Sequence, residues 1–193
     1  MIHKTRTVKR PRAEVEGWMG SHSKTENLEK LRDEILASIP DAWLFPERGR
    51  VKGFLGPGPV MLVAERPSTG HFGGPSDYLL YTLLEKYDAA DAHLTDVIKC
   101  RGRVGDSYPN DIGPHRLIFD RELEIVQPTL IVAFGQKVYD LLQFSLAGLG
   151  IPIRTVWHYA YARRGEAKAN AFEQQMKNAL LGLPSYAVPA INS

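Results

Sequence analysis

A short buried strand followed by a glycine-rich loop constrains the fold of this chain more than any other feature. Residues 60–64 (VMLVA) are apolar, and the run ends abruptly at a carboxylate, Glu65. Residues 66–75 are rich in Gly and Pro and hold one phenyl ring, Phe72, before a helical pattern begins. In an open α/β sheet, a loop of this kind at the carboxyl end of a strand forms part of a pocket. Because no Lys-Ser or Lys-Thr follows the glycines, the segment is not typical of a phosphate-binding loop.

Strand and helix patterns alternate along the rest of the chain. The other expected strands are residues 93–99, 129–134 and 153–157, and the expected helices are residues 26–39, 75–86, 111–126, 136–142 and 167–181. This alternation predicts a three-layer α/β/α fold with a central four-stranded parallel sheet. Right-handed crossovers bring the carboxyl ends of such strands to one edge. We therefore expect Glu65, Asp96, Gly135 and His158 to meet at that edge.

Length and composition fit one globular domain. The chain has 193 residues, of which 44% are hydrophobic and 24% charged, as is typical of a soluble globular protein. We expect a single α/β domain over residues 25–193, preceded by a flexible basic arm over residues 1–24. No apolar run is long enough to cross a bilayer, and the basic start lacks the apolar core of a secretory signal. The sequence thus favours a cytoplasmic monomer with no membrane partner.

Charge and cysteine content exclude some classes of site. The net charge of +2 is too small to indicate nucleic-acid binding by itself. The single cysteine, Cys100, excludes an internal disulfide framework and an all-cysteine metal site. We expect Cys100 to be a buried structural thiol, and we predict no bound metal.

Several segments, found in the same order, resemble the motifs of one enzyme superfamily. Residues 64–68 (AERPS) are similar to a GEAPG motif, and residues 71–80 (HFGGPSDYLL) to PFVGRAGQLL. Residues 94–103 (LTDVIKCRGR) are similar to ITNVVKCRPP, residues 130–135 (LIVAFG) to VIVALG, and residues 157–164 (WHYAYARR) to YHPAYLLR. The chain therefore resembles the uracil-DNA glycosylase superfamily, and its family 4 type most closely, over roughly residues 27–164.

The resemblance implies catalytic roles for two residues. Enzymes of this superfamily flip the target base out of the helix and into a pocket. Glu65 would position or deprotonate water near the sugar and stabilise the positive charge that develops there. His158 would donate a hydrogen bond to the base carbonyl, where negative charge develops. The alternatives are that Glu65 caps a loop or helix and that His158 is structural.

The resemblance also implies where a flipped base would lie. Phe72 would stack on the ring, which is worth roughly 1–3 kcal/mol, although it could instead be a core aromatic. Asp96 would contact the edge of the base. Ala64 and Tyr78 belong to the matching motifs and are expected in the same pocket.

Contacts to the DNA backbone are expected from two further segments. These contacts would position the DNA without reading its sequence, or fill the gap that the flipped base leaves. Ordinary solvated surface side chains are the alternative interpretation. The candidate residues are Ser68, Ser76, Tyr161, Arg163 and Arg164.

Three departures from the family pattern bear on function. Family 4 members hold an iron-sulfur cluster on four cysteines, and Cys100 alone is present here, so we predict no cluster and no cofactor. Asp96 stands where the family has Asn, and Tyr159 stands where it has Pro. An ionised Asp only accepts hydrogen bonds, whereas an Asn amide both donates and accepts.

The Asp96 departure leaves two outcomes open. Burial can protonate the carboxyl, so that uracil is still accepted. Alternatively, the pocket prefers a base that presents an amino group, or a purine such as hypoxanthine. In either case we expect Asp96 to shift or relax the specificity.

The function that these patterns favour is that of a monofunctional DNA glycosylase in base-excision repair, acting on DNA that contains a damaged base. It would hydrolyse the N-glycosidic bond of a deaminated base and leave an abasic site. Two alternatives stay open: a non-catalytic relative that binds DNA or a modified base, and a hydrolase or transferase of free nucleosides or nucleotides. Strong salt dependence of binding would distinguish the DNA-binding classes from the last one.

Overall fold

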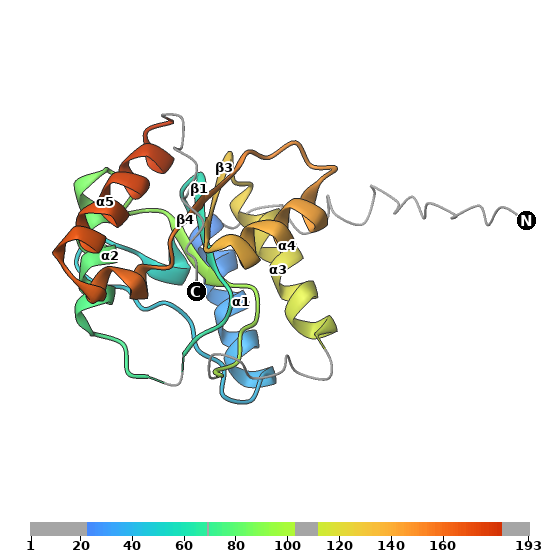
Figure 1. Ribbon diagram of the computed structural model, residues 1–193. Helices are drawn as coiled ribbons and strands as arrows, with labels where there is room; N and C mark the ends of the chain where they lie inside the picture. The colour runs from blue at the N-terminus through green and yellow to red at the C-terminus, as the bar shows by residue number, and fades with distance from the viewer. Residues whose placement is uncertain (1–22, 69, 103–111, 183–193) are drawn as a thin grey trace, which may run out of the picture.

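The centre of the protein is a four-stranded parallel sheet (Figure 1). The computed structural model describes residues 23–68, 70–102 and 112–182. The strands are β1 (Val60–Ala64), β2 (His93–Asp96), β3 (Leu130–Phe134) and β4 (Ile153–Val156), in the spatial order β2-β1-β3-β4. All three pairings are parallel. The predicted three-layer fold with a four-stranded parallel sheet is therefore confirmed.

Helices cover both faces of the sheet. Helices α2 (Pro75–Lys86) and α5 (Glu166–Leu180) lie on one face, and α3 (Gly113–Val126) and α4 (Gln136–Leu146) lie on the other (Figure 1). Successive strand residues point to opposite faces, so Leu62 and Val132 pack toward α2 and α5, whereas Met61 and Ile131 pack toward α3 and α4. Burial on both faces explains why the two central strands, β1 and β3, are continuously apolar.

Helix α1 (Lys24–Ser38) begins at a capping box and packs beside α3. The Glu26 backbone N–H donates to Ser23 Oγ at 3.2 Å, and the Ser23 backbone N–H donates to Glu26 Oε2 at 2.7 Å. Each bond satisfies a donor that the first turn would otherwise leave unpaired. Leu31 and Ile35 on the buried side of α1 join Ile118 of α3 in a third apolar cluster.

The register of the strands brings four loops to one edge of the sheet. Ala64 is paired with Asp96, Val63 with Ala133, and Phe134 with Val156. The chain crosses in opposite directions from β1 and from β3, so the topological switch point lies between these two central strands. Glu65, Asp96, Gly135 and His158 therefore lie at or just beyond the same edge, as the strand and helix pattern predicts.

The ends of several elements differ from the predicted ones. Strand β2 ends at Asp96 rather than at residue 99, because the Lys99 carbonyl accepts from the Trp43 backbone N–H at 3.0 Å instead of continuing the sheet. Helix α4 runs on to Leu146, which is buried against the sheet. The short 3₁₀ helix η3 (Tyr159–Arg164) was not predicted, because six residues are too few for a clear hydrophobic period.

The predicted basic arm lies mostly outside the described residues, which begin at position 23. Ser23 caps α1, and Lys24 is already helical, so the helix starts before the predicted end of the arm. The predicted start of the third helix at residue 111 also lies outside the described residues, and α3 is described from Gly113.

Gly53, in the short 3₁₀ helix η2 (Gly53–Leu55), fixes the loop that carries Trp43 and Phe45. Its φ is +59°, and a Cβ atom there would lie 2.3 Å from the Pro46 carbonyl oxygen. We expect Gly53→Ala to lower the free energy of unfolding by about 2 kcal/mol or more, because the left-handed backbone and the overlap both oppose a side chain. Urea denaturation measures this difference.

Gly148→Ala is the matched control for that substitution. A Cβ at Gly148 meets no described atom within 4 Å, and its φ is not in the left-handed region. The Gly148→Ala substitution should change the free energy of unfolding by less than about 1 kcal/mol. Equal losses in the two variants would contradict the role given to Gly53.

Candidate active site

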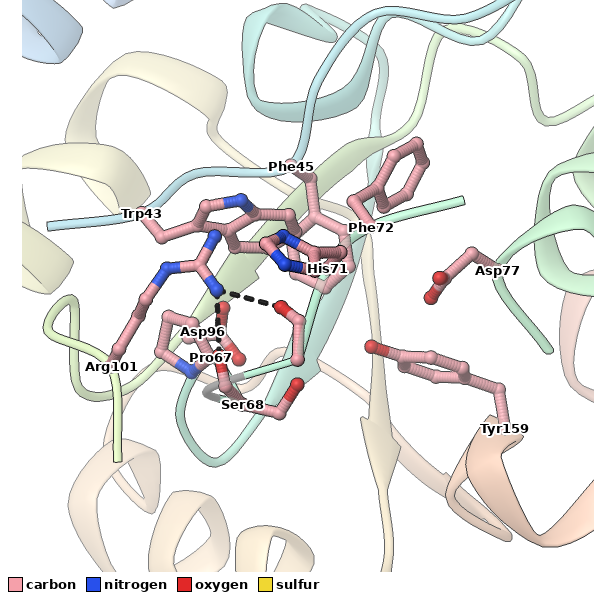
Figure 2. Close-up of a pocket in the computed structure, with 11 residues that line it drawn as sticks. Trp43, Phe45, Pro67, Ser68, His71, Phe72, Asp77, Asp96, Arg101 and Tyr159 are labelled. Atoms are coloured by element: carbon pink, nitrogen blue, oxygen red, sulfur yellow. Dashed lines mark hydrogen bonds between the residues drawn. The ribbon is translucent and has the colours of Figure 1, made fainter. Parts of the chain in front are cut away.

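A cavity of about 310 Å³ opens at the carboxyl edge of the sheet, beside β1 and β2 (Figure 2). This volume includes space that is open to solvent. Segments far apart in the sequence form its walls: the loop before β1, the glycine-rich loop after β1, the first turn of α2, the end of β2, and η3. The lining residues are the aromatic Trp43, Phe45, Phe72 and Tyr159, the ionisable His71, Asp77, Asp96 and Arg101, and the loop residues Pro67, Ser68 and Gly70.

Phe72 combines core contacts with a place on the cavity wall. Its ring centroid lies 5.2 Å from that of Tyr81, edge-on, and 6.0 Å from that of Trp43. Trp43 packs in turn edge-on against Phe45 at 5.0 Å. These contacts hold the aromatic wall in place, so Phe72 packs against the core and also lines the cavity. Its stacking on a base is still a prediction.

Asp96 is the buried polar group of the cavity. Its side chain ends β2, is 3% exposed, and has an Oδ2 atom without a hydrogen-bond partner among the described residues. Burial raises the pKa of Asp96 to about 8; the nearby ammonium of Lys99 opposes this shift and Glu122 adds to it. At neutral pH the group is therefore mainly an uncharged acid, with one O–H donor and one C=O acceptor. In hydrogen-bonding terms it resembles the amide of an Asn.

Asp77 and Tyr159 add a second polar part to the wall. Asp77 Oδ2 accepts the backbone N–H groups of Gly73 and Gly74, each at 3.0 Å, at the start of α2, where negative charge is favourable. Burial raises the pKa of Tyr159, and Asp96 and Asp77 add to the shift. The Tyr159 hydroxyl is therefore protonated and able to donate, and it lies near the Asp77 carboxylate in Figure 2.

His158 adjoins the cavity but is not among its described lining residues. Its ring stacks on that of Tyr159, with centroids 4.5 Å apart. Its Nδ1 accepts the backbone N–H of Ala160 at 3.2 Å. Burial lowers the pKa of His158, although the charges of Glu65 and Asp77 act in the opposite direction. The imidazole is thus neutral at pH 7, and because Nδ1 accepts, its proton is on Nε2.

Glu65 directly follows β1 and forms an ion pair across the switch point. Its Oε1 lies 2.6 Å from the Nζ of Lys137 on α4, and the Glu65 and Lys137 side chains are 33% and 65% exposed. A pair this exposed is worth about 0–1 kcal/mol, so a ligand can displace Lys137 at little cost. Glu65 is not among the described lining residues either; it precedes the lining residue Pro67 by two positions.

Two of the residues predicted to contact a base lie outside the cavity walls. Ala64 is 1% exposed and packs in the core between the sheet and α2. Tyr78 is 41% exposed, and the guanidinium of Arg48 lies 3.8 Å from its ring centroid. Each helical residue is rotated by about 100° from the one before it, so Tyr78 and Asp77 lie on different sides of α2. The Tyr78 hydroxyl lies beside Gly73 of the glycine-rich loop.

The five residues predicted to contact DNA fall into two groups. Ser68 lines the cavity, and Ser76 lies in the first turn of α2, outside the cavity walls. Tyr161, Arg163 and Arg164 all lie in η3, directly after His158. The Arg164 guanidinium lies 4.3 Å from the Tyr161 ring centroid, and both arginines are exposed at the end of the helix.

Sequence patterns did not reveal the roles of Trp43, Arg101 and Asp77 in the cavity. Arg101 Nη1 donates to the carbonyls of Ser68 and Gly70 at 3.0 and 2.7 Å, so it ties the glycine-rich loop to the segment after β2. Trp43 lies in a loop without periodicity, and only the tertiary structure brings it here. Asp77 did carry a signal, since an acidic residue in the first turn of a helix that begins with Pro is a capping pattern.

Within the described ranges, no three His, Cys, Asp or Glu side chains are grouped so that they could hold a metal ion. The helices described there also include none that is long and apolar enough to cross a membrane. Cys100 has a free thiol and is partly rather than fully buried.

No model of a known protein family matches this sequence, and no curated protein matches it. The resemblance to uracil-DNA glycosylases is therefore still a prediction.

The raised pKa of Asp96 predicts a specific dependence of stability on pH. The folded protein binds a proton at Asp96 up to about pH 8, whereas the unfolded chain loses it near pH 4. The stabilisation is thus complete below about pH 4 and is lost as the pH rises to about 8. We expect the free energy of unfolding to fall across this window by up to about 5 kcal/mol, and Asp96→Asn to remove that component.

Urea denaturation of both proteins at a series of pH values measures this difference. The relevant quantity is the wild-type value minus the Asp96→Asn value, since other groups titrate equally in both. A difference that stays constant from pH 4 to pH 8 would show that Asp96 titrates normally in the folded protein.

Proposed function

We propose that this protein is a monofunctional DNA glycosylase that removes a deaminated base, uracil or a related base such as hypoxanthine, by base flipping. It would act as a cytoplasmic monomer without a cofactor, and its product would be an abasic site in DNA. The superfamily that it resembles is that of the uracil-DNA glycosylases, with Glu65 and His158 in the catalytic positions.

The observation that carries the proposal is the neutral acid of Asp96 in an aromatic cavity. Uracil presents an N3–H donor and an O4 acceptor side by side, and a protonated carboxyl presents the complementary C=O and O–H groups. Phe72 and Trp43 supply flat apolar surface on the same cavity wall. A cavity with one buried donor and acceptor pair and aromatic walls suits a planar base better than a sugar or a phosphate.

Two neighbouring residues suit the chemistry of bond cleavage. A neutral His158 with its proton on Nε2 can donate to a base carbonyl that gains negative charge as the glycosidic bond breaks. Glu65 can orient a water molecule and balance the positive charge on the sugar. Both act from the rim of the cavity, where the sugar of a flipped nucleotide would remain while its base enters.

Lys137 supports a second candidate function, a non-catalytic protein that binds DNA or a modified base. The Lys137 ammonium donates to Glu65 Oε1 at 2.6 Å. While this ion pair persists, the Glu65 carboxylate is a weaker base. In a glycosylase, bound DNA would draw Lys137 to a phosphate and release Glu65. In a non-catalytic protein the pair would persist.

A cleavage panel tests the proposal. Oligonucleotides carrying uracil, hypoxanthine, xanthine, thymine opposite guanine, or undamaged cytosine are incubated with the protein and then with hot alkali, as single and double strands. We expect scission at a deaminated base, and Glu65→Ala to slow it by roughly 10²–10⁴-fold.

Glu173→Ala is the matched control for this panel. Glu173 on α5 forms an exposed ion pair with Lys86 at the same distance of 2.6 Å, so its loss should leave the rate unchanged. DNA binding without scission on any substrate would favour the non-catalytic candidate. Hydrolysis of free nucleosides without cleavage of DNA would favour neither the glycosylase nor the non-catalytic protein.

The arginines of η3 predict a salt-dependent component of DNA binding. We expect Arg163→Ala and Arg164→Ala each to weaken binding of all sequences alike and to reduce the slope of log K against log salt by about 1, since each removes one phosphate contact. Fluorescence anisotropy with a labelled oligonucleotide at several salt concentrations measures the slope. Arg32→Ala on α1 is the control, and an equal change in that variant would mean that the η3 arginines have no specific role.

A further inference from the structure

A buried group of charged side chains lies behind the cavity, on the other face of the sheet. Lys99 and Glu122 are both 0% exposed, and Lys99 Nζ lies 2.7 Å from Glu122 Oε1. Thr95 Oγ1 accepts from Lys99 Nζ at 2.6 Å and lies 2.8 Å from Glu122 Oε2. His93 Nε2 lies 3.6 Å from Glu122 Oε2. Neither the sequence patterns nor the proposed chemistry assigned a role to this group.

The group is connected to Asp96 through the main chain. Lys99 Nζ donates a hydrogen bond to the Asp96 carbonyl oxygen. Thr95 and Asp96 are successive residues of β2, so their side chains point to opposite faces. Thr95 therefore meets Glu122 of α3 on one face, while Asp96 lines the cavity on the other.

A second contact ties the same segment to α3. His115 Nδ1 accepts the backbone N–H of Lys99 at 3.2 Å. The end of β2 is thus held by two residues of α3, Glu122 through the Lys99 ammonium and His115 through the Lys99 main chain. The segment from Thr95 to Lys99 has little freedom to move relative to the sheet.

Stability alone does not explain such a group. Removing two charges from water costs about as much as their attraction returns, and a well-packed apolar pair in the same place is often at least as stable. What the pair does supply is a defined geometry, because the Lys99 ammonium donates at the same time to Glu122 Oε2, Thr95 Oγ1 and the Asp96 carbonyl oxygen. The residue whose position this geometry fixes is Asp96, the last residue of β2.

We propose that Lys99 and Glu122 are positioning residues for Asp96: Lys99 holds the main chain at the end of β2, and Glu122 holds Lys99. This inference rests on the proposed function in one respect, that Asp96 contacts the base. A rigid carboxyl can present its donor and acceptor to one edge of a planar base, whereas a mobile carboxyl would accept many partners weakly.

The charges around Asp96 give the proposal a measurable signature. Lys99 after β2 and Glu122 of α3 act on its carboxyl with opposite sign. Asp77 of α2, Tyr159 of η3, and Arg101 and His71 face it across the cavity. Burial raises the pKa of Asp96, and of the two charges Lys99 has the stronger effect. Loss of both should therefore move the carboxyl titration to a higher pH.

The test uses a double variant, Lys99→Met with Glu122→Gln, so that neither charge is left buried alone. Its matched control is Lys86→Met with Glu173→Gln, an exposed Lys–Glu pair of similar separation, 2.6 Å. Carboxyl-carbon NMR follows the titration of Asp96 in the full chain, with Asp96→Asn to assign the signal. Excision of uracil from a single-stranded oligonucleotide is measured in parallel.

We expect the double variant to shift the Asp96 titration to a higher pH and to lower kcat/KM on uracil by about 100-fold, because a misplacement of about 1 Å costs this much. The control should change neither. An Asp96 signal and titration identical to wild type in the folded double variant would overturn the proposal. Because NMR requires no turnover, it decides the proposal even if no substrate is cleaved, which separates its failure from that of the proposed function.

Thr95→Val keeps the test valid if the double variant does not fold. This substitution preserves the shape of the side chain and removes only the hydroxyl, which accepts from Lys99 Nζ and donates to Glu122 Oε2. We expect it to move the Asp96 signal in the same direction by a smaller amount. An unmoved Asp96 signal in this variant would likewise overturn the proposal.

Discussion

The parallel pairing of β1 with β2 is the constraint on which the rest of the site depends. It sets Ala64 opposite Asp96, so Glu65, which follows β1, lies one residue beyond the level of the carboxyl that ends β2. The glycine-rich loop can then fold over the end of β2, where Arg101 holds it through two carbonyls. A shift of one residue in this register would turn Asp96 to the other face of the sheet, where the Lys99–Glu122 pair lies.

Burial gives Asp96 its chemical character. An exposed Asp would be ionised at neutral pH and could only accept hydrogen bonds, but the cavity makes this one mainly a neutral acid. In the sequence alone, Asp in place of Asn suggested an altered specificity. A neutral Asp96, however, presents a donor and an acceptor as Asn does, so it is compatible with binding the same edge of a base. Burial lowers the pKa of His158 whereas it raises that of Asp96, because it favours the uncharged form of both groups.

The sequence anticipated much of the fold and part of the site. Continuous apolar runs identified the two central strands, β1 and β3, because strands buried on both faces have no polar side. Strands β2 and β4 contain polar residues, and the β-α alternation implied that all four strands are parallel. The site residues at strand ends, Glu65, Asp96 and His158, came from the same reasoning. Ala64 and Tyr78 were expected in the pocket because their motifs were, but a motif does not say which way each side chain points. Trp43 had no signal. Arg101 lies in the matching motif of residues 94–103, but the motif did not predict its bonds to the glycine-rich loop, since these are contacts between distant segments.

Local patterns by themselves determined the strands, the helices, the layers and the edge at which the chain places its polar strand ends. They could do so because hydrophobic period and chain direction are local properties. Only the tertiary structure decided that Asp96 is neutral, that His158 carries its proton on Nε2, that Glu65 meets Lys137, and that Lys99 and Glu122 lie together behind β2. Protonation and ion pairing depend on burial and on neighbours brought from far along the chain, and these exist only once the sheet and its helices have packed.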